Sequence, residues 1–155
     1  MPLMRSARAV SADDRAAITA LCTEYVFRID NGFADTVPEL FADDATWDGP
    51  HGALRGRADL DRLWTERAKR RVRTRHSISN VRLAWDADDR LHGWITFTLC
   101  RAEADETPRP MPSLVAEHID TYAFDPQRGW LFQTRAVSMA FYDETWDAYA
   151  AKAAE

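Results

Sequence analysis

The residues best suited to proton transfer in this sequence are Asp30 and His76. A carboxylate that is hydrogen-bonded to one imidazole nitrogen fixes the tautomer, raises the basicity of the ring and leaves the other nitrogen free to move a proton. Distance along the chain does not by itself pair the two residues. Each also has a purely structural interpretation, in which Asp30 caps a turn and His76 is a hydrogen-bonded core residue.

Tyr25 is a second candidate for the same chemistry, because it precedes Asp30 by five residues, a little over one helical turn. Side chains displaced by that amount can both reach the mouth of one cavity, where the Tyr25 phenol could donate a hydrogen bond to a developing oxyanion. The alternative is a core aromatic residue whose hydroxyl lies at the rim.

Arg135 lies among apolar residues of a predicted strand, so its guanidinium needs either a partner or a ligand. Asp120, in the neighbouring predicted strand, is the evident partner, and the pair is either a structural ion pair or a substrate anchor. His118 shares the strand face of Asp120 and is either a pocket donor or a half-buried polar residue. Asn80 could hold a substrate group or the edge of its strand, and Trp47 is expected in the wall of the pocket or the core.

Metal and redox chemistry have no local signal in this chain. Its four histidines never occur in His-x-x-x-His or Glu-x-x-His spacing, so a metal site would have to be assembled from distant strands. Cys22 and Cys100 form no Cys-x-x-Cys motif and no disulfide framework. We therefore expect no metal, no cofactor and two reduced cysteines, and we place His51 and His92 in surface turns.

Length and composition favour one domain. A chain of 155 residues that is 46% hydrophobic can fill a single core, which we expect to span residues 1–155. Residues 1–10 are expected to form a flexible tail, and residues 144–155 either a terminal helix or a second flexible tail.

Charge and hydropathy exclude several classes of partner. The formal net charge of −5 repels phosphate backbones, and the basic run from Arg67 to Arg75 is interpreted as the solvated end of a helix, so no nucleic-acid role is expected. No apolar stretch approaches the ~20 residues that span a bilayer, and the N-terminus lacks the pattern of a signal peptide. We therefore expect a cytoplasmic protein with no membrane role.

The first part of the chain predicts three helices and a hairpin. Ser11 and Asp14 start a helix whose apolar residues recur at helical spacing until Asn31-Gly32 stops it. A shorter helix is predicted over residues 35–41, with Pro38 in its first turn. Residues 45–47 and 53–56 predict a small hairpin, and residues 59–69 a third helix.

The second part predicts an antiparallel meander of four long strands. They are expected over residues 72–85, 91–102, 113–124 and 130–142. Strands near a dozen residues, against a usual ~5–6, curl strongly, and the three helices can cover the concave face. The expected fold class is α+β, a half-open cone that encloses one apolar pocket.

Five short motifs follow one another along the chain. They are Tyr25-x-x-x-x-Asp30-Asn31-Gly32, Leu40-Phe41-Ala42-Asp43-Asp44-Ala45, Gly56-Arg57, Thr74-Arg75-His76-x-x-x-Asn80-Val81, and Gly129-Trp130 leading to Arg135. Their order and spacing resemble the nuclear transport factor 2-like superfamily, in particular its SnoaL-like branch, over nearly the whole chain. The resemblance implies a cystatin-like cone, with three helices packed on a curved mixed or antiparallel sheet. The superfamily includes dehydratases, isomerases, cyclases and plain binding modules, so the fold does not set the function.

The resemblance also implies roles for particular residues. In the scytalone and bile acid dehydratases of this superfamily, an Asp at the position of Asp30 hydrogen-bonds a His at the position of His76, and a Tyr stands at the position of Tyr25. The resemblance therefore implies that Asp30, His76 and Tyr25 are catalytic. The residues expected to bind substrate are Arg135, Asp120, His118, Trp47 and Asn80. The chain departs from scytalone dehydratase where that enzyme has further Tyr residues and a second His. Trp47 stands in the first hairpin strand, and Thr96, Thr98 or Cys100 occupy the strand that would carry the second His.

We therefore expect a cofactor-independent lyase or isomerase that removes a proton next to a carbonyl in a bulky, apolar cyclic substrate of polyketide, steroid or terpenoid type. Loss of water is the leading reaction. A polyketide cyclase or ring-forming isomerase is the nearest alternative, and a non-catalytic ligand-binding or subunit-assembly module is the second. Because residues 94–100 and 131–141 carry apolar side chains on both sheet faces, we also expect a homodimer through the convex face.

Overall fold

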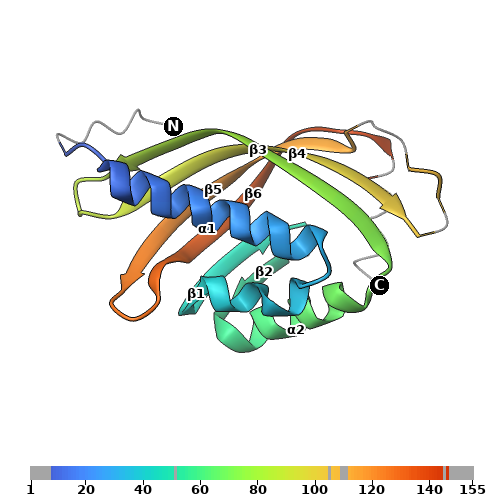
Figure 1. Cartoon of the computed structure of the whole chain (residues 1–155), viewed down its shortest axis with the longest axis horizontal. Coiled ribbons are helices and arrows are strands. Elements are labelled where there is room, and N and C mark those ends of the chain that lie inside the picture. Colours follow the sequence, from blue (N-terminus) through green and yellow to red (C-terminus); the bar gives the residue numbers. More distant parts are fainter. Residues whose placement is uncertain (1–7, 51, 105, 109–111, 145, 147–155) are drawn as a thin grey trace.

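Residues 8–50, 52–104, 106–108, 112–144 and 146 are described by the computed structural model (Figure 1). His51, most of the predicted N-terminal tail and nearly all of the predicted C-terminal tail lie outside the described residues.

Helix α1 (Ala12–Asp30) begins as predicted, because the Ser11 hydroxyl accepts a hydrogen bond of 3.0 Å from the backbone N–H of Asp14. Its buried residues recur at helical spacing and are Ile18, Leu21, Cys22, Tyr25, Val26 and Ile29. Gly32, two residues beyond the end of the helix, takes a φ of 89°, a conformation that side chains disfavour. The helix therefore directs Tyr25 into the core and carries Asp30 at its last position.

The second helix differs from the prediction. It is a 3-10 helix, η1 (Ala34–Leu40), and Pro38 is its fifth residue rather than part of its first turn. Proline lacks the N–H and clashes with the carbonyl four residues before it in an α-helix, so the tighter 3-10 geometry suits this short segment. Phe41, expected at the end of this helix, is the first residue of strand β1 (Phe41–Gly49).

Helix α2 (Gly56–Lys69) starts three residues before the predicted position. Asp59, predicted as the first residue of the helix, is its fourth, and its carboxylate accepts a 3.0 Å hydrogen bond from the backbone N–H of Arg55, which caps the start of the helix. Gly56, expected to close the hairpin, opens the helix with a φ of 73°. Strand β2 (Gly52–Arg55) is correspondingly short, and it pairs antiparallel with β1.

The meander is confirmed. Strands β3 (Val72–Trp85), β4 (Leu91–Glu103), β5 (Leu114–Asp125) and β6 (Gly129–Tyr142) pair antiparallel in sequence order. Strand β1 adds to β6 in parallel, which gives one mixed six-stranded sheet in the order β2-β1-β6-β5-β4-β3.

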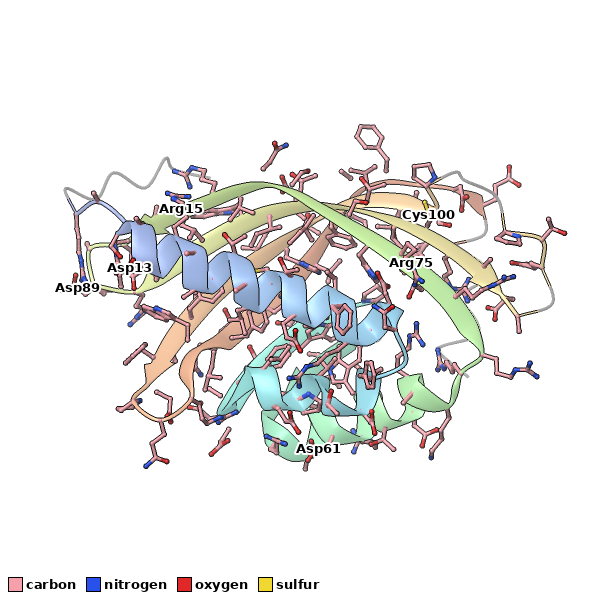
Figure 2. All side chains as sticks on the ribbon, in the orientation of Figure 1. Asp13, Arg15, Asp61, Arg75, Asp89 and Cys100 are labelled. Carbon is pink, nitrogen blue, oxygen red and sulfur yellow. The ribbon has the colours of Figure 1, made fainter. Side chains whose placement is uncertain are left out.

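The sheet curves around α1, which lies along its concave side, while η1 and α2 lie beside β1 and β2 (Figure 1). The main core is formed by buried residues of α1, η1, α2 and the sheet, and a second cluster gathers near the end of the curved strands at Phe97, Leu99, Leu114, Ala116 and Trp146. Charged side chains such as Asp13, Asp61 and Asp89 point outward around this core (Figure 2). In the described part of the chain, no helix is long and apolar enough to cross a membrane.

Candidate active site

The structure brings Asp30 and His76 into direct contact. Nδ1 of His76 lies 2.7 Å from Oδ1 of Asp30, and the backbone N–H of His76 donates to Oδ2 at 2.7 Å. The Thr74 hydroxyl donates to Oδ1, also at 2.7 Å. Three donors therefore converge on one carboxylate, whose side chain is only 6% exposed.

The local structure explains this convergence. Thr74 and His76 are two residues apart on β3, so both side chains lie on the same face of the strand. The Asp30 end of α1 lies against this part of β3, where Nη1 of Arg75 donates to the Asp30 carbonyl at 2.7 Å. That bond satisfies a carbonyl at the helix end and holds α1 against the strand.

The charge state of Asp30 sets the tautomer of His76. Burial raises the pKa of Asp30, but the hydrogen bonds and charge of His76 and the Thr74 hydroxyl outweigh it, so the pKa lies below its ordinary value. An ionised carboxylate only accepts hydrogen bonds, so Nδ1 of His76 carries the proton. Nε2 is then the nitrogen with a free lone pair, and His76 lines the pocket.

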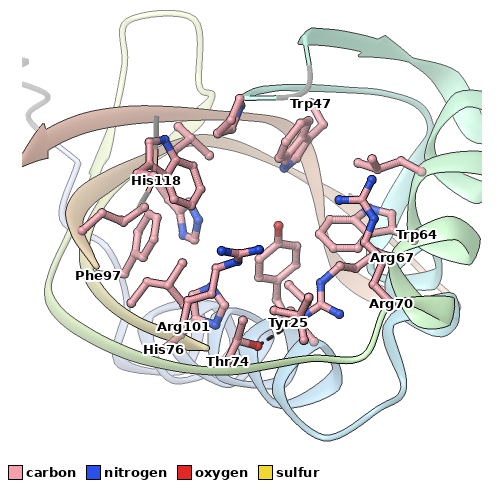
Figure 3. A pocket seen from close by; sticks show the side chains of 18 residues that line it. Tyr25, Trp47, Trp64, Arg67, Arg70, Thr74, His76, Phe97, Arg101 and His118 are labelled. Atoms are coloured by element: carbon pink, nitrogen blue, oxygen red, sulfur yellow. Dashed lines mark hydrogen bonds between the residues drawn. The ribbon is translucent and has the colours of Figure 1, made fainter. Parts of the chain in front are cut away.

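Tyr25 lies in the same pocket, and its hydroxyl points into the space (Figure 3). Its ring makes edge contacts with the rings of Phe41, Trp64, His118 and Phe132 at centroid distances of 5.6 to 6.1 Å. Burial raises the pKa of the Tyr25 phenol, although the nearby Arg135 guanidinium and Trp47 act in the opposite direction. The phenol therefore stays protonated at neutral pH and can donate a hydrogen bond.

The wall of the pocket is mostly apolar, and its volume is about 110 Å³. That volume far exceeds the ~15 Å³ that one water needs, so the pocket has room for a small organic group. Trp47 and Trp64 meet edge to face at 6.2 Å and form part of the wall. Gly49 makes this placement possible, because a Cβ there would overlap the Trp47 ring.

His118 also lines the pocket. Its ring stacks on Phe97 at 4.2 Å, and Phe97 in turn lies 5.8 Å from the His76 ring. Burial, together with the positive charges of Arg135 and His76, lowers the pKa of His118 well below its ordinary value. His118 is therefore a neutral polar residue at physiological pH.

Arg135 and Asp120 are not pocket residues. Nε and Nη2 of Arg135 donate to the two carboxylate oxygens of Asp120 at 2.8 and 2.7 Å, and both side chains are fully buried. The guanidinium lies 4.2 Å from the Tyr25 ring centroid and 3.8 Å from that of Phe132. Arg135 and Asp120 therefore form the ion pair that was one of the two interpretations, and it lies behind the Tyr25 ring.

Two further residues lie elsewhere. Asn80, expected to bind substrate, is exposed, does not line the pocket and has a φ of 50° at an irregularity in the β3–β4 pairing. Short polar Asn side chains tolerate this left-handed conformation, so a local backbone role explains its presence. His92, predicted in a surface turn, is instead the second residue of strand β4 and is partly buried, because its Nε2 lies 2.8 Å from Asp86 Oδ2.

The sequence interpretation missed four polar residues of the pocket: Arg67, Arg70, Thr74 and Arg101. Arg67 and Arg70 belong to the basic run that we interpreted as a solvated helix end, and this interpretation is wrong for Arg67, which is half-buried. Arg101 had a detectable signal, since it continues the alternate positions that Ile95, Phe97 and Leu99 occupy on β4.

Comparison with solved structures defines the class of the fold. ActVI-ORFA from Streptomyces coelicolor superposes with a TM-score of 0.69 at 16% identity, over 81% of this chain and 96% of that chain. A candidate scytalone dehydratase from Novosphingobium aromaticivorans gives a TM-score of 0.73 at 16% identity, over 85% and 87%. A cystatin-like protein of unknown function from Nostoc punctiforme gives 0.69 at 17% identity, over 86% and 96%. The chain is thus a cystatin-like α+β cone of the nuclear transport factor 2 type.

A family model narrows this class. The model of the SnoaL-like domain matches residues 10–136, and the chain belongs to this family. The resemblance stated from the sequence motifs is therefore confirmed. No curated protein matches the chain.

Proposed function

We propose that this protein is a cofactor-independent acid–base lyase or isomerase, and that its leading reaction is loss of water next to a carbonyl in a bulky cyclic substrate. The observation that carries the proposal is the 2.7 Å contact between His76 Nδ1 and Asp30 in the wall of an apolar pocket. A simple binding module has no need of this contact, whereas an acid–base enzyme requires it. A structure of the same fold is described as a candidate scytalone dehydratase, which agrees with the proposal.

The proposed reaction needs only the residues of this chain. Nε2 of His76 takes the proton from the carbon next to the carbonyl, and Asp30 stabilises the resulting imidazolium. The electron pair of the broken C–H bond forms the enolate and then the new C=C bond as the C–O bond to the hydroxyl breaks. His76 returns the proton to the departing hydroxyl, which leaves as water.

Tyr25 is the proposed donor to the carbonyl oxygen. Its phenol is protonated, buried and directed into the pocket, so it can stabilise negative charge as the enolate forms (Figure 3). The Arg135 guanidinium behind its ring adds positive charge to this region without touching the substrate.

A polyketide cyclase or ring-forming isomerase would use the same His76 and Asp30, and would differ only in the bond that the enolate makes. The two classes are separated by product. We therefore test proton removal and elimination separately, with simple bicyclic ketones as probes.

The first probe is 1-tetralone in D2O, in which exchange of the α-protons followed by NMR measures proton removal alone. The second is 3-hydroxy-1-tetralone, in which loss of water and enolisation give 1-naphthol, measured by absorbance. The protein should accelerate both reactions, and His76→Ala should lower both by ~10²–10⁴-fold. Exchange without elimination would favour the isomerase or cyclase, and acceleration of neither probe would favour the binding module.

A further inference from the structure

One polar side chain in the wall of the pocket has no polar partner among the described residues. His118 lies on β5 and lines the pocket, and it is only 3% exposed. Within the described part of the chain it forms no hydrogen bond and no ion pair, and it meets Tyr25 and Phe97 through ring contacts alone. Its ring nitrogens are not among the unpaired side-chain nitrogens that packing encloses completely, so they are open to the pocket.

His92 shows how this fold satisfies a partly buried histidine outside the pocket. Its ring stacks on Trp94 at a centroid distance of 6.1 Å, much as the His118 ring stacks on Phe97 at 4.2 Å. Nε2 of His92 also lies 2.8 Å from Oδ2 of Asp86. Burying a polar group is unfavourable unless it is hydrogen-bonded, so a ligand that supplies a partner to His118 gains what Asp86 gives to His92.

The charge state of His118 indicates which ligand group fits it. Burial and the nearby positive charge of Arg135 keep the imidazole neutral at physiological pH. A neutral imidazole has one nitrogen that donates a hydrogen bond and one that accepts. A hydroxyl group both donates and accepts, so it can pair with either nitrogen and with either tautomer.

The position of His118 separates this hydroxyl from the reacting carbon. The Phe97 ring stacks on His118 and lies 5.8 Å from the His76 ring, so the three rings follow one another along one side of the pocket (Figure 3). A ligand that reaches both histidines therefore extends past Phe97. The group that it offers to His118 is then a different one from the carbon that gives its proton to His76.

We propose that His118 is a specificity-determining residue, which binds a hydroxyl group on the ring system of the substrate, away from the reacting carbon. A site built to hydrogen-bond a hydroxyl discriminates strongly against the analogue that lacks it, because the buried polar group of the protein is then left unpaired. This inference rests on the proposed function and deepens it, since it specifies a second polar group that the substrate carries.

The test compares 1-naphthol with four dihydroxynaphthalenes, the 1,5, 1,6, 1,7 and 1,8 isomers, which place a second hydroxyl at each position of the other ring. Isothermal titration at pH 7.5 should show that at least one isomer binds ~10-fold or more tightly than 1-naphthol. His118→Phe keeps a ring against Phe97 and removes both nitrogens. It should bind 1-naphthol about as well as the parent does, and its preference for the second hydroxyl should disappear.

His92→Phe is the matched control. It makes the same replacement at a histidine that also stacks on an aromatic ring, but His92 does not line the pocket, so this variant should keep the full preference. Thermal unfolding checks that each variant folds. If His118→Phe does not fold, the 15N shifts of the His118 ring in the parent replace it: the preferred isomer should change them and 1-naphthol should not, and equal shifts with both ligands would contradict the inference.

Three other results would overturn the inference: equal affinity for 1-naphthol and all four isomers, a preference that survives in His118→Phe, or an equal loss in His92→Phe. Failure of the proposed function looks different. If His76→Ala leaves the tetralone reactions unchanged while the His118-dependent preference is present, the pocket binds hydroxylated rings without the proposed catalysis. If the preference is absent while the His76-dependent reactions persist, only the role of His118 is wrong.

Discussion

Replacing Asp30 with asparagine should trap His76 in the wrong tautomer, because the two oxygens of Asp30 receive different donors. Oδ1 faces His76 Nδ1 and Thr74, whereas Oδ2 faces the backbone N–H of His76. If the Asn amide oxygen takes the place of Oδ1, its NH2 group meets the His76 backbone N–H, and two donors oppose each other. If it takes the place of Oδ2, the NH2 group donates to Nδ1, and the ring proton moves to Nε2.

The size of the expected loss in kcat follows from the energetic cost of the first arrangement. Leaving a buried backbone N–H unsatisfied costs about 1–3 kcal/mol, so the second arrangement dominates. In that arrangement Nε2 carries the proton and cannot accept one from the substrate. Each ~1.4 kcal/mol reduces tenfold the fraction of molecules in which Nε2 of His76 is unprotonated. We therefore expect kcat to fall by ~10–100-fold, less than for His76→Ala.

The assay is elimination from 3-hydroxy-1-tetralone, with binding of 1-naphthol measured in parallel. Affinity for 1-naphthol should change little, because the lost interaction acts mainly in the transition state. The 15N shifts of the His76 ring should report the change of tautomer directly. Asp86→Asn is the control, since Asp86 holds His92 at 2.8 Å outside the pocket, and it should retain activity within twofold. Full activity in Asp30→Asn, or an equal loss in Asp86→Asn, would refute the reasoning.

Three further predictions concern stability and assembly. Arg135→Met should lower the free energy of unfolding in urea by ~3–5 kcal/mol, because it leaves the Asp120 carboxylate buried without its partner. The double variant Arg135→Met with Asp120→Leu should recover most of that stability. A double variant as unstable as Arg135→Met would contradict the account. The stability that Asp30 contributes is present above its unfolded pKa near ~3.9 and is lost as pH falls through its lowered folded pKa. The difference in the free energy of unfolding between the parent and Asp30→Asn should therefore shrink below about pH 4. A difference that stays constant with pH would exclude this contribution. The protein should be a homodimer, because Phe141 and Tyr142 at the end of β6 are 71% and 55% exposed, and Phe141→Asp should shift light scattering toward the monomer; a parent that is monomeric at micromolar concentration would rule this out.

The fold could be predicted where the periodicity of apolar residues was long. Helix α1 and strands β3 to β6 each carry a pattern of a dozen or more residues, and they appear close to the predicted bounds. The predicted bounds of the short elements were wrong, because single residues determine where such elements begin and end. Asp59 caps α2 from within and Pro38 favours a 3-10 turn, and neither effect is visible in the hydrophobic pattern.

The site was predictable only in part, since motifs identify residues but not their neighbours. Tyr25, Asp30 and His76 were named from the order of the motifs, and the structure places Tyr25 and His76 in the pocket wall, with Asp30 hydrogen-bonded to His76 behind it. Asn80 belonged to the same motif but lies outside the pocket, because the β3–β4 pairing is irregular just beside it. No spacing rule anticipates such an irregularity.

Polar side chains on the inward faces of the strands are a better guide to the residues of the site than the short motifs are. Alternate positions on β3, β4 and β5 face the concave side, and apolar side chains there are explained by the core. A polar side chain at such a position loses hydration, so it must be satisfied by a partner or by a ligand. His76 and Thr74 are satisfied through Asp30, and Asp120 through Arg135. His118 also faces inward and lines the pocket, where its ring stacks on Phe97. A polar side chain at an inward strand position is therefore the sequence feature that points to the pocket, because the apolar core does not require it, and Thr74, His76 and His118 all meet this criterion.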